Sequence, residues 1–267
     1  MKLTLLLLLI GHILGDYYLQ TQAMADKKEQ ENKTLLRHCL VYALPFIGLA
    51  GLYQFNGDFI RAAFWAVLIH CIIDSGKAAL MKRRDRKLKT RPVSGSGKVY
   101  LLDQMIHWLS LIFIAFFLRE KLKQLTPWPV IEAMFTEFSY TLGGALRWLL
   151  AILLIYRPSN ITFIKLFSIY KPEEIPGESA EQEPISFKER QKLKAGGIIG
   201  VLEKMISLIF LSVAQYMAIG LILTAKSIAR YDKISKSSTF AEYYLIGTLT
   251  SIIMVLLIYF LCFVVLV

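Results

Sequence analysis

Residues 2–22 of the chain read KLTLLLLLIGHILGDYYLQTQ, a mainly apolar run that carries one histidine, His12, and one aspartate, Asp16. Residues four apart lie on the same face of a helix, one turn from each other. A segment of about 20 mainly apolar residues is long enough to cross a bilayer. An ionisable group at the centre of such a helix costs about 2.5–3.5 kcal/mol and marks a functional site by default. The stretch therefore predicts a membrane helix with chemistry on one face.

The same pairing of histidine and aspartate occurs twice more along the chain. The chain has four histidines, and three of them have an aspartate four residues away. The pairs are His12 with Asp16, His70 with Asp74, and His107 with Asp103, and the fourth histidine is His38. All of them lie in apolar stretches, so these seven residues are the first candidates for a functional site.

Composition places the chain among helical membrane proteins. Its 267 residues are 55% hydrophobic, the mean hydropathy is +0.51, and the net charge is +11. We expect an all-α, polytopic transmembrane bundle of about seven spans. The expected spans are 3–22, 34–55, 59–81, 99–118, 138–156, 198–223 and 241–267. Because the basic residues lie mainly between these runs, as membrane topology requires, we expect no nucleic-acid partner.

The expected domain organisation has three parts. Residues 1–156 form an N-terminal bundle that carries the histidines. Residues 157–194 hold a short interfacial helix at 161–170 and an acidic, proline-rich cytoplasmic linker, and residues 195–267 form the C-terminal helices. The first run also resembles a secretory signal peptide, with a small-residue motif at Ala23-Met24-Ala25. We expect it to be retained as a span, because a long, polar-punctuated segment separates the apolar run from that motif.

Basic residues in the connections predict the orientation of the helices. They concentrate at 23–33 and 82–98, so both connections should be cytoplasmic and the N-terminus outside. Asp16, His38, Asp74 and Asp103 then lie about four to seven residues from the cytoplasmic helix ends. At roughly 1.5 Å per residue, their depths agree within about 5 Å. This agreement predicts one cluster on four helices near the cytoplasmic face.

Imidazole and carboxylate groups are ligands for zinc, manganese and iron. We expect a divalent metal cofactor, zinc first and manganese or iron as alternatives. The expected metal ligands are His12, Asp16, His38, His70, Asp74, Asp103 and His107, with Asp16, Asp74 and Asp103 as catalytic residues. Two alternatives stay open: a relay or ion site of a transporter, and interhelical hydrogen bonding without chemistry.

Several other polar residues are candidates for substrate binding. They are Lys77, Gln20, Gln104, Lys226 and Arg230. Lys77 lies one turn from Asp74, and its other interpretation is a lysine that extends to the interface. Lys226 and Arg230, also one turn apart, suit a lipid phosphate or a nucleotide, or serve as anchors of a helix end.

Several short motifs occur in the first half of the chain: GHILGDYYLQTQ at 11–22, RH at 37–38, YALP at 42–45, HCIID with Lys77 at 70–77, and LDQMIH at 102–107. In these motifs the chain resembles an uncharacterised domain-of-unknown-function family of bacterial integral membrane proteins. The resemblance extends to about residue 118, and C-terminal stretches at 200–204, 225–230 and 241–249 resemble longer members. The pattern also has a looser similarity to bacterial membrane-bound metal-dependent hydrolases.

These observations predict a metal-dependent hydrolase in the bacterial cytoplasmic membrane. Its partners would be the lipid bilayer and a lipid or small-molecule substrate near the cytoplasmic face, for example a lipid that contains phosphate. A transporter is the first alternative and a structural membrane subunit the second. Nothing in the sequence fixes the oligomeric state.

Overall fold

The computed structural model describes residues 1–88, 97–120, 122, 125–167, 170 and 187–267. Within these ranges the chain forms helices and turns and no strand, so the predicted all-α class is confirmed. Among the described residues, five helices are by length and composition able to cross a membrane: Asn32–Leu52, Gly57–Arg84, Gly97–Phe117, Leu142–Phe167 and Ser238–Val265. The multi-pass membrane class is confirmed by these helices, whereas the count of seven spans is not.

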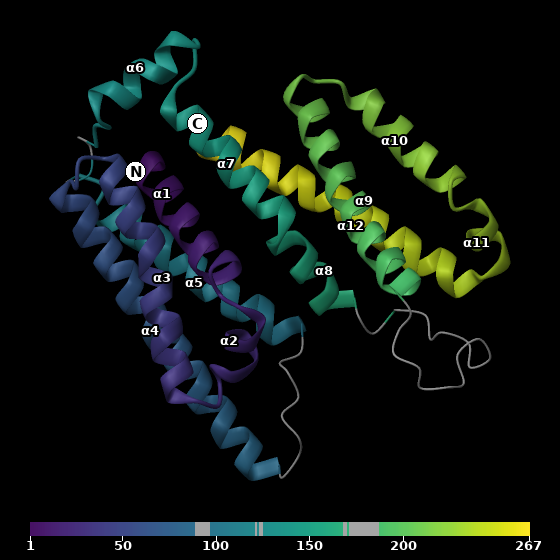
Figure 1. The fold of residues 1–267 in the computed structure, drawn as a ribbon, viewed down its shortest axis with the longest axis horizontal. Coiled ribbons are helices and arrows are strands. Elements are labelled where there is room, and N and C mark those ends of the chain that lie inside the picture. Colours follow the sequence, from purple (N-terminus) through teal and green to yellow (C-terminus); the bar gives the residue numbers. More distant parts are fainter. Residues whose placement is uncertain (89–96, 121, 123–124, 168–169, 171–186) are drawn as a thin grey trace. The chain divides into compact units, whose positions relative to one another are not determined.

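The chain divides into two compact units. The first comprises residues 1–158 and 262–267, and the second comprises residues 159–261. The helices of the first unit are α1 (Lys2–Ile13), the π-helix η1 (Leu14–Tyr18), α2 (Gln22–Lys27), α3 (Asn32–Leu52), α4 (Gly57–Leu88), α5 (Gly97–Phe117), α6 (Pro129–Glu137), α7 (Leu142–Tyr156) and the π-helix η4 (Leu261–Val265). Figure 1 shows their order along the chain by colour.

Helix α1 is the centre of the first unit. It packs against α3, α4, α5 and α7 (Figure 1). Its leucines at positions 6–9 are all buried, with at most 2% of each residue exposed. A helix that is apolar on every side belongs in a core, surrounded by other helices. The first expected span is therefore an inner helix, and the two polar groups of this segment face other helices rather than lipid.

Two glycines let α1 and α3 approach closely. A Cβ atom at Gly11 would lie 2.5 Å from the Phe46 ring, and one at Gly15 would lie 2.6 Å from the Tyr42 ring and 3.1 Å from the Tyr42 Cα. Small residues four apart are a common means of close helix packing in membranes. They bring His12 and Asp16 near the side chains of α3.

The outer faces of the long helices are apolar. On α3, Leu36, Leu40, Leu44 and Ile47 are each more than half exposed. Only 22–39% of the residues in the apolar windows of the five membrane-length helices are buried. Such large exposed apolar surfaces are unusual for a soluble monomer and suit contact with lipid tails.

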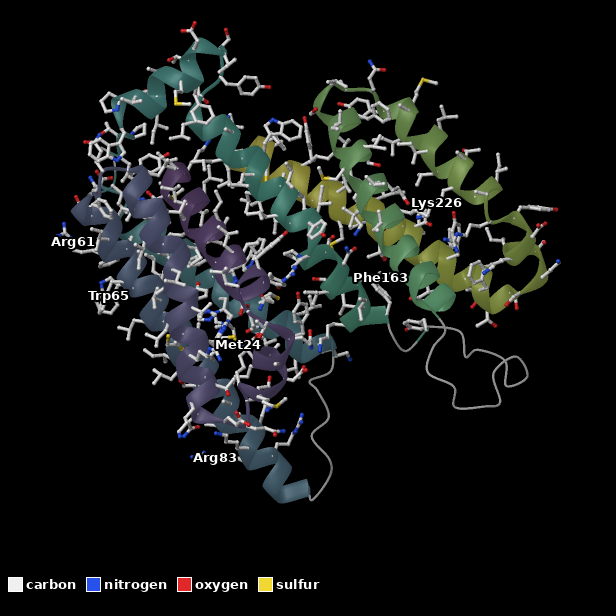
Figure 2. The ribbon with its side chains drawn as sticks, in the orientation of Figure 1. Met24, Arg61, Trp65, Arg83, Phe163 and Lys226 are labelled. Atoms are coloured by element: carbon white, nitrogen blue, oxygen red, sulfur yellow. The ribbon has the colours of Figure 1, made fainter. Side chains whose placement is uncertain are left out.

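The second unit contains α8 (Pro158–Phe167), α9 (Phe187–Ser212), α10 (Tyr216–Ile228), α11 (Tyr231–Lys236) and α12 (Ser238–Phe260). Helix α9 packs against α10 and α12, and α11 packs against α12. Figure 2 labels Phe163 on α8 and Lys226 on α10.

The segment expected as one span at 198–223 is interrupted in the structure. Helix α9 ends at Ser212, α10 begins at Tyr216, and the backbone reverses through Ala214, whose φ is 56°. The turn contains Val213 and Ala214 and no glycine or proline, so hydropathy gives no sign of it.

Two other expected segments can be compared with the structure only in part. The helix expected at 161–170 is observed as α8, which follows α7 after Arg157 alone. Its interfacial position stays a prediction. Most of the expected acidic linker, residues 171–186, lies outside the described residues.

Candidate metal centre

The structure brings the seven histidines and aspartates of the sequence analysis together. They come from α1, η1, α3, α4 and α5, and His12 and His70 have ring centroids 5.8 Å apart. The exposed fraction of each histidine is 2% or less. The residues of this cluster, called the His/Asp cluster below, are His12, Asp16, His38, His70, Asp74, Asp103 and His107. Their proximity agrees with the single cluster that the sequence predicts, while their depth in a membrane and their roles stay predictions.

Three of these residues form a first group of ligand atoms. Asp16, His38 and His70 each offer one ligand atom, and all three atoms lie within 4.8 Å of one another. The Nε2 atoms of His38 and His70 are 3.1 Å apart, and His38 Nε2 is 3.4 Å from Asp16 Oδ1. Ligand atoms about 2.0–2.1 Å from a tetrahedral zinc ion lie roughly 3.3 Å from each other. These separations are those of hydrogen bonds and ion pairs, and they also suit the ligand atoms of one metal ion.

Asp74 joins this group to a second one. Its Oδ2 atom lies 3.3 Å from His38 Nε2 and 3.7 Å from His70 Nε2. Its Oδ1 atom lies 3.5 Å from His107 Nε2. Asp74, Asp103 and His107 form the second group of atoms within 4.8 Å of one another. The two oxygens of the Asp74 carboxylate thus face different histidines, as the oxygens of a carboxylate between two metal ions do.

The first polar pair stands at an irregular turn of its helix. Residues Leu14–Tyr18 form a π-helix, in which the Leu19 amide donates to the Leu14 carbonyl over 2.9 Å. This π-helix is the last turn of the first helix, and π-turns are known at the C-terminal ends of helices. The wider turn carries Asp16, which is 8% exposed and buried beside the histidines.

Tyr42 also belongs to the site, although the sequence alone does not predict it there. Its ring stacks on the His70 imidazole, and its hydroxyl lies 3.1 Å from His12 Nδ1. Metal-binding histidines usually direct their second nitrogen to an oxygen that fixes the ring. In the sequence, Tyr42 follows His38 by four residues, and this spacing indicates that both lie on one helix face.

Lys28 is a second member of the site that the sequence alone does not predict. It follows α2, is 9% exposed, and places its Nζ atom 2.8 Å from Asp74 Oδ2, 3.2 Å from His38 Nε2 and 3.5 Å from Asp16 Oδ1. Burial lowers the pKa of Lys28, but the Asp16 and Asp74 carboxylates raise it by more, so this pKa lies above its ordinary value. Lys28 is therefore a buried ammonium group. No sequence pattern distinguished it from its neighbours in a basic connection.

Several buried atoms of the cluster make no hydrogen bond within the described part of the chain. They are Nε2 of His12 and His107, Nδ1 of His38 and His70, and Oδ1 of Asp16. An unsatisfied buried polar atom costs about 1–3 kcal/mol. Nε2 of His12 and His107 and Oδ1 of Asp16 are of the kind that coordinates transition metals. Asp16 Oδ1 has ion-pair neighbours at 3.4–3.5 Å, and His107 Nε2 lies 3.5 Å from Asp74 Oδ1, so a metal would replace these long contacts. It would also give His12 Nε2 a partner, and these atoms therefore fit the predicted metal.

The candidate substrate-binding residues of the first unit differ in their contacts. Lys77 Nζ lies 3.1 Å from Glu29 Oε1 and 3.3 Å from Asp103 Oδ2, so its carboxylate partner in the cluster is Asp103. The Gln104 amide donates to Asp16 Oδ2 over 3.3 Å. Gln20 is half-buried, and its Oε1 atom makes no hydrogen bond in the described part of the chain.

Lys226 and Arg230 belong to the second unit and have different surroundings. Lys226 Nζ lies 2.6 Å from Glu203 Oε2 and 5.5 Å from the centre of the Tyr244 ring. The adjacent Lys204 instead donates to Ser159 and Asn160, so Lys226 is the cation that pairs with Glu203. Arg230 is half-buried at the start of α11.

Comparison with known proteins identifies the domain that carries the His/Asp cluster. Residues 4–132 match the family described as "Protein of unknown function (DUF3307)". Neither the curated proteins nor the solved structures contain a match to the chain. The matched range includes all seven residues of the cluster together with Lys28 and Tyr42. Residues 4–132 are therefore similar to this family of proteins of unknown function, which agrees with the resemblance seen in the sequence.

Proposed function

We propose that the protein is a membrane-embedded, metal-dependent hydrolase that acts on a membrane-associated substrate near the cytoplasmic face. The observation that carries this proposal is the position of the Asp74 carboxylate. Its two oxygens face His38 and His70 on one side and His107 on the other, at 3.3–3.7 Å. These separations suit two neighbouring metal positions that share one carboxylate.

Each position would have its own set of ligands. The first ion would be held by Asp16, His38 and His70, and the second by Asp103 and His107. Asp74 would bind both ions. His12 Nε2 supplies one more ligand atom, with its Nδ1 atom directed at Tyr42. Zinc is the first candidate for these imidazole and carboxylate ligands, followed by manganese and iron.

Two divalent ions about 3.5–4 Å apart stabilise the attacking and leaving oxygens of a phosphoester displacement. The protein itself contributes proton transfer and orientation. The side-chain exposure of Asp103 is 11%, against 2% for Asp74. Asp103 is therefore the carboxylate best placed to accept a proton from water, and Lys77 beside it would orient a phosphate group.

The substrate class follows from the surroundings of the cluster. Side-chain exposure rises from 2% at Asp74 to 11% at Asp103 and 23% at Lys77, which marks the side from which a substrate would approach. The apolar outer faces of the surrounding helices would lie among lipid tails. A lipid with a phosphate headgroup, such as a phospholipid or an isoprenoid phosphate, suits both surroundings.

The topology is part of the same proposal. The N-terminus would lie outside the cytoplasmic membrane of a bacterium, and the basic connections at 23–33 and 82–98 would lie in the cytoplasm. The count of seven spans also stays a prediction. The orientation of the first helices can be tested with Lys33→Cys and Asp58→Cys, each introduced alone into a variant without Cys39, Cys71 and Cys262. An impermeant thiol reagent added to whole cells should label only the cysteine at position 58.

Metal content and hydrolysis test the function directly. Protein purified without chelators should contain about two equivalents of transition metal. After reconstitution it should release phosphate from vesicles that contain phosphatidate or an isoprenyl phosphate. A chelator should stop the release, and added zinc or manganese should restore it. A protein that neither retains nor rebinds a divalent transition metal would refute the proposal.

A proton or ion relay is the second candidate, and one observation favours it. Asp16, His38, Asp74 and His107 form a continuous series with steps of 3.3–3.5 Å. Series of buried aspartates and histidines carry protons in membrane transporters. Liposomes decide between the two candidates, because a relay predicts proton or metal flux that is lost in Asp74→Asn, whereas a hydrolase predicts phosphate release without flux.

A further inference from the structure

Lys28 reaches the His/Asp cluster from a short segment at its edge. Helix α2 begins after Thr21, whose side chain accepts a hydrogen bond from the Met24 amide. Met24 is 6% exposed and is labelled in Figure 2. The Lys28 amide donates to the Met24 carbonyl over 2.9 Å, so the lysine continues the turn that the buried methionine anchors.

The side chain of the neighbouring lysine, Lys27, does not enter the cluster. The Lys27 side chain is 63% exposed and lies 4.0 Å from Glu31. The Lys28 side chain is 11% exposed. Two adjacent lysines at the end of α2 therefore differ in burial, and of these two only Lys28 enters the cluster.

The contacts of Lys28 are made with the proposed ligand atoms themselves. Its Nζ atom lies within 3.5 Å of Asp74 Oδ2, His38 Nε2 and Asp16 Oδ1. A divalent ion bound by these atoms would be about 2 Å from each of them. It would then lie next to the ammonium group, and two cations at that distance repel each other strongly when buried.

We propose that Lys28 is a tethered competitor for the first metal position, so that a divalent ion binds Asp16, His38 and Asp74 only when α2 and its following turn withdraw the ammonium group. This inference rests on the proposed metal site and adds its regulation. The apparent metal affinity then equals the intrinsic affinity multiplied by the fraction of molecules in which Lys28 is withdrawn. Lys28 therefore sets the metal concentration at which the site fills.

The test is a metal titration of three full-length proteins in detergent: wild type, Lys28→Met and Lys27→Met. Methionine keeps the length of the side chain and removes its charge. Lys28→Met should bind zinc or manganese about tenfold or more tightly than wild type, and Lys27→Met should match wild type. Equal or weaker binding by Lys28→Met, with metal bound by all three proteins, overturns this inference alone. Absence of binding by all three overturns the proposed metal site as well.

A second measurement uses the wild-type protein, so it does not depend on the folding of a variant. Lysines are acylated with a water-soluble reagent, with and without metal, and the labelled peptides are quantified by mass spectrometry. Saturating metal should increase the labelling rate of Lys28 severalfold and leave that of Lys27 unchanged. A Lys28 labelling rate that does not rise when metal binds contradicts the proposed withdrawal.

Discussion

The ring of Tyr42 lies flat on the imidazole of His70, with centroids 3.6 Å apart and planes inclined by only 3°. The same tyrosine holds its hydroxyl 3.1 Å from His12 Nδ1. One residue of α3 therefore fixes two histidines from two other helices. It does so by stacking on one ring and by hydrogen bonding to the other.

Tyr42→Phe separates these two contacts. Phenylalanine keeps the stacked ring and loses the hydroxyl, so His12 should lose its orientation while His70 keeps its place. Loss of such an orienting partner typically reduces metal affinity by about 10- to 100-fold. Zinc titration measures this loss, and Tyr53→Phe, at the end of the same helix, is the control. An affinity equal to wild type would show that the hydroxyl does not orient a ligand.

Asp74→Asn tests the shared carboxylate. The substitution keeps the shape of the side chain and removes the charge that both metal positions would use. We expect loss of both equivalents of metal, whereas His107→Ala should lose only the second. Elemental analysis of the purified variants gives the ratio. The control is Asp58→Asn on the same helix, because Asp58 pairs only with the exposed Arg61 in the described part of the chain.

A mononuclear site would give a different pattern. In that case, His107→Ala would either retain all bound metal or lose all of it. Either result contradicts the bridging role of Asp74 while leaving a single metal ion in place.

Gly15→Ala should disturb the packing of the first unit. The added Cβ would meet both the side chain and the backbone of Tyr42, at 2.6 Å and 3.1 Å, so the helices must separate. Overpacking of this kind costs about 1–3 kcal/mol of stability. Thermal unfolding in detergent should show a lower Tm. Gly48→Ala on α3 should leave the Tm near that of wild type, since a Cβ atom at Gly48 meets nothing within 4 Å.

Much of the His/Asp cluster follows from sequence because its parts obey simple rules. Spacing of four residues places His70 and Asp74 on one helix face, and the charges of the connections predict which helix ends share a side of the membrane. Lys28 and Tyr42 escape these rules. The direction of Lys28 depends on how Met24 packs, and the role of Tyr42 depends on which ring lies opposite it. The turn at Ala214 also has no sequence signal, since Val213 and Ala214 are apolar and a single polar residue, Gln215, separates them from α10.

Lys226→Ala should destabilise the second unit without affecting the metal. It would leave Glu203, which is 7% exposed, without the cation that lies 2.6 Å away. Removal of one partner of a buried ion pair typically costs about 3–5 kcal/mol. Lys226→Arg keeps the charge and should retain most of the stability, while Lys233→Ala removes an exposed lysine of the same unit and should have little effect. All three variants should keep the wild-type metal content per folded molecule, because every proposed ligand lies in the first unit. If Lys226 instead binds a lipid phosphate, Lys226→Ala should keep its Tm in detergent and lose the stabilisation that anionic lipid gives the wild-type protein.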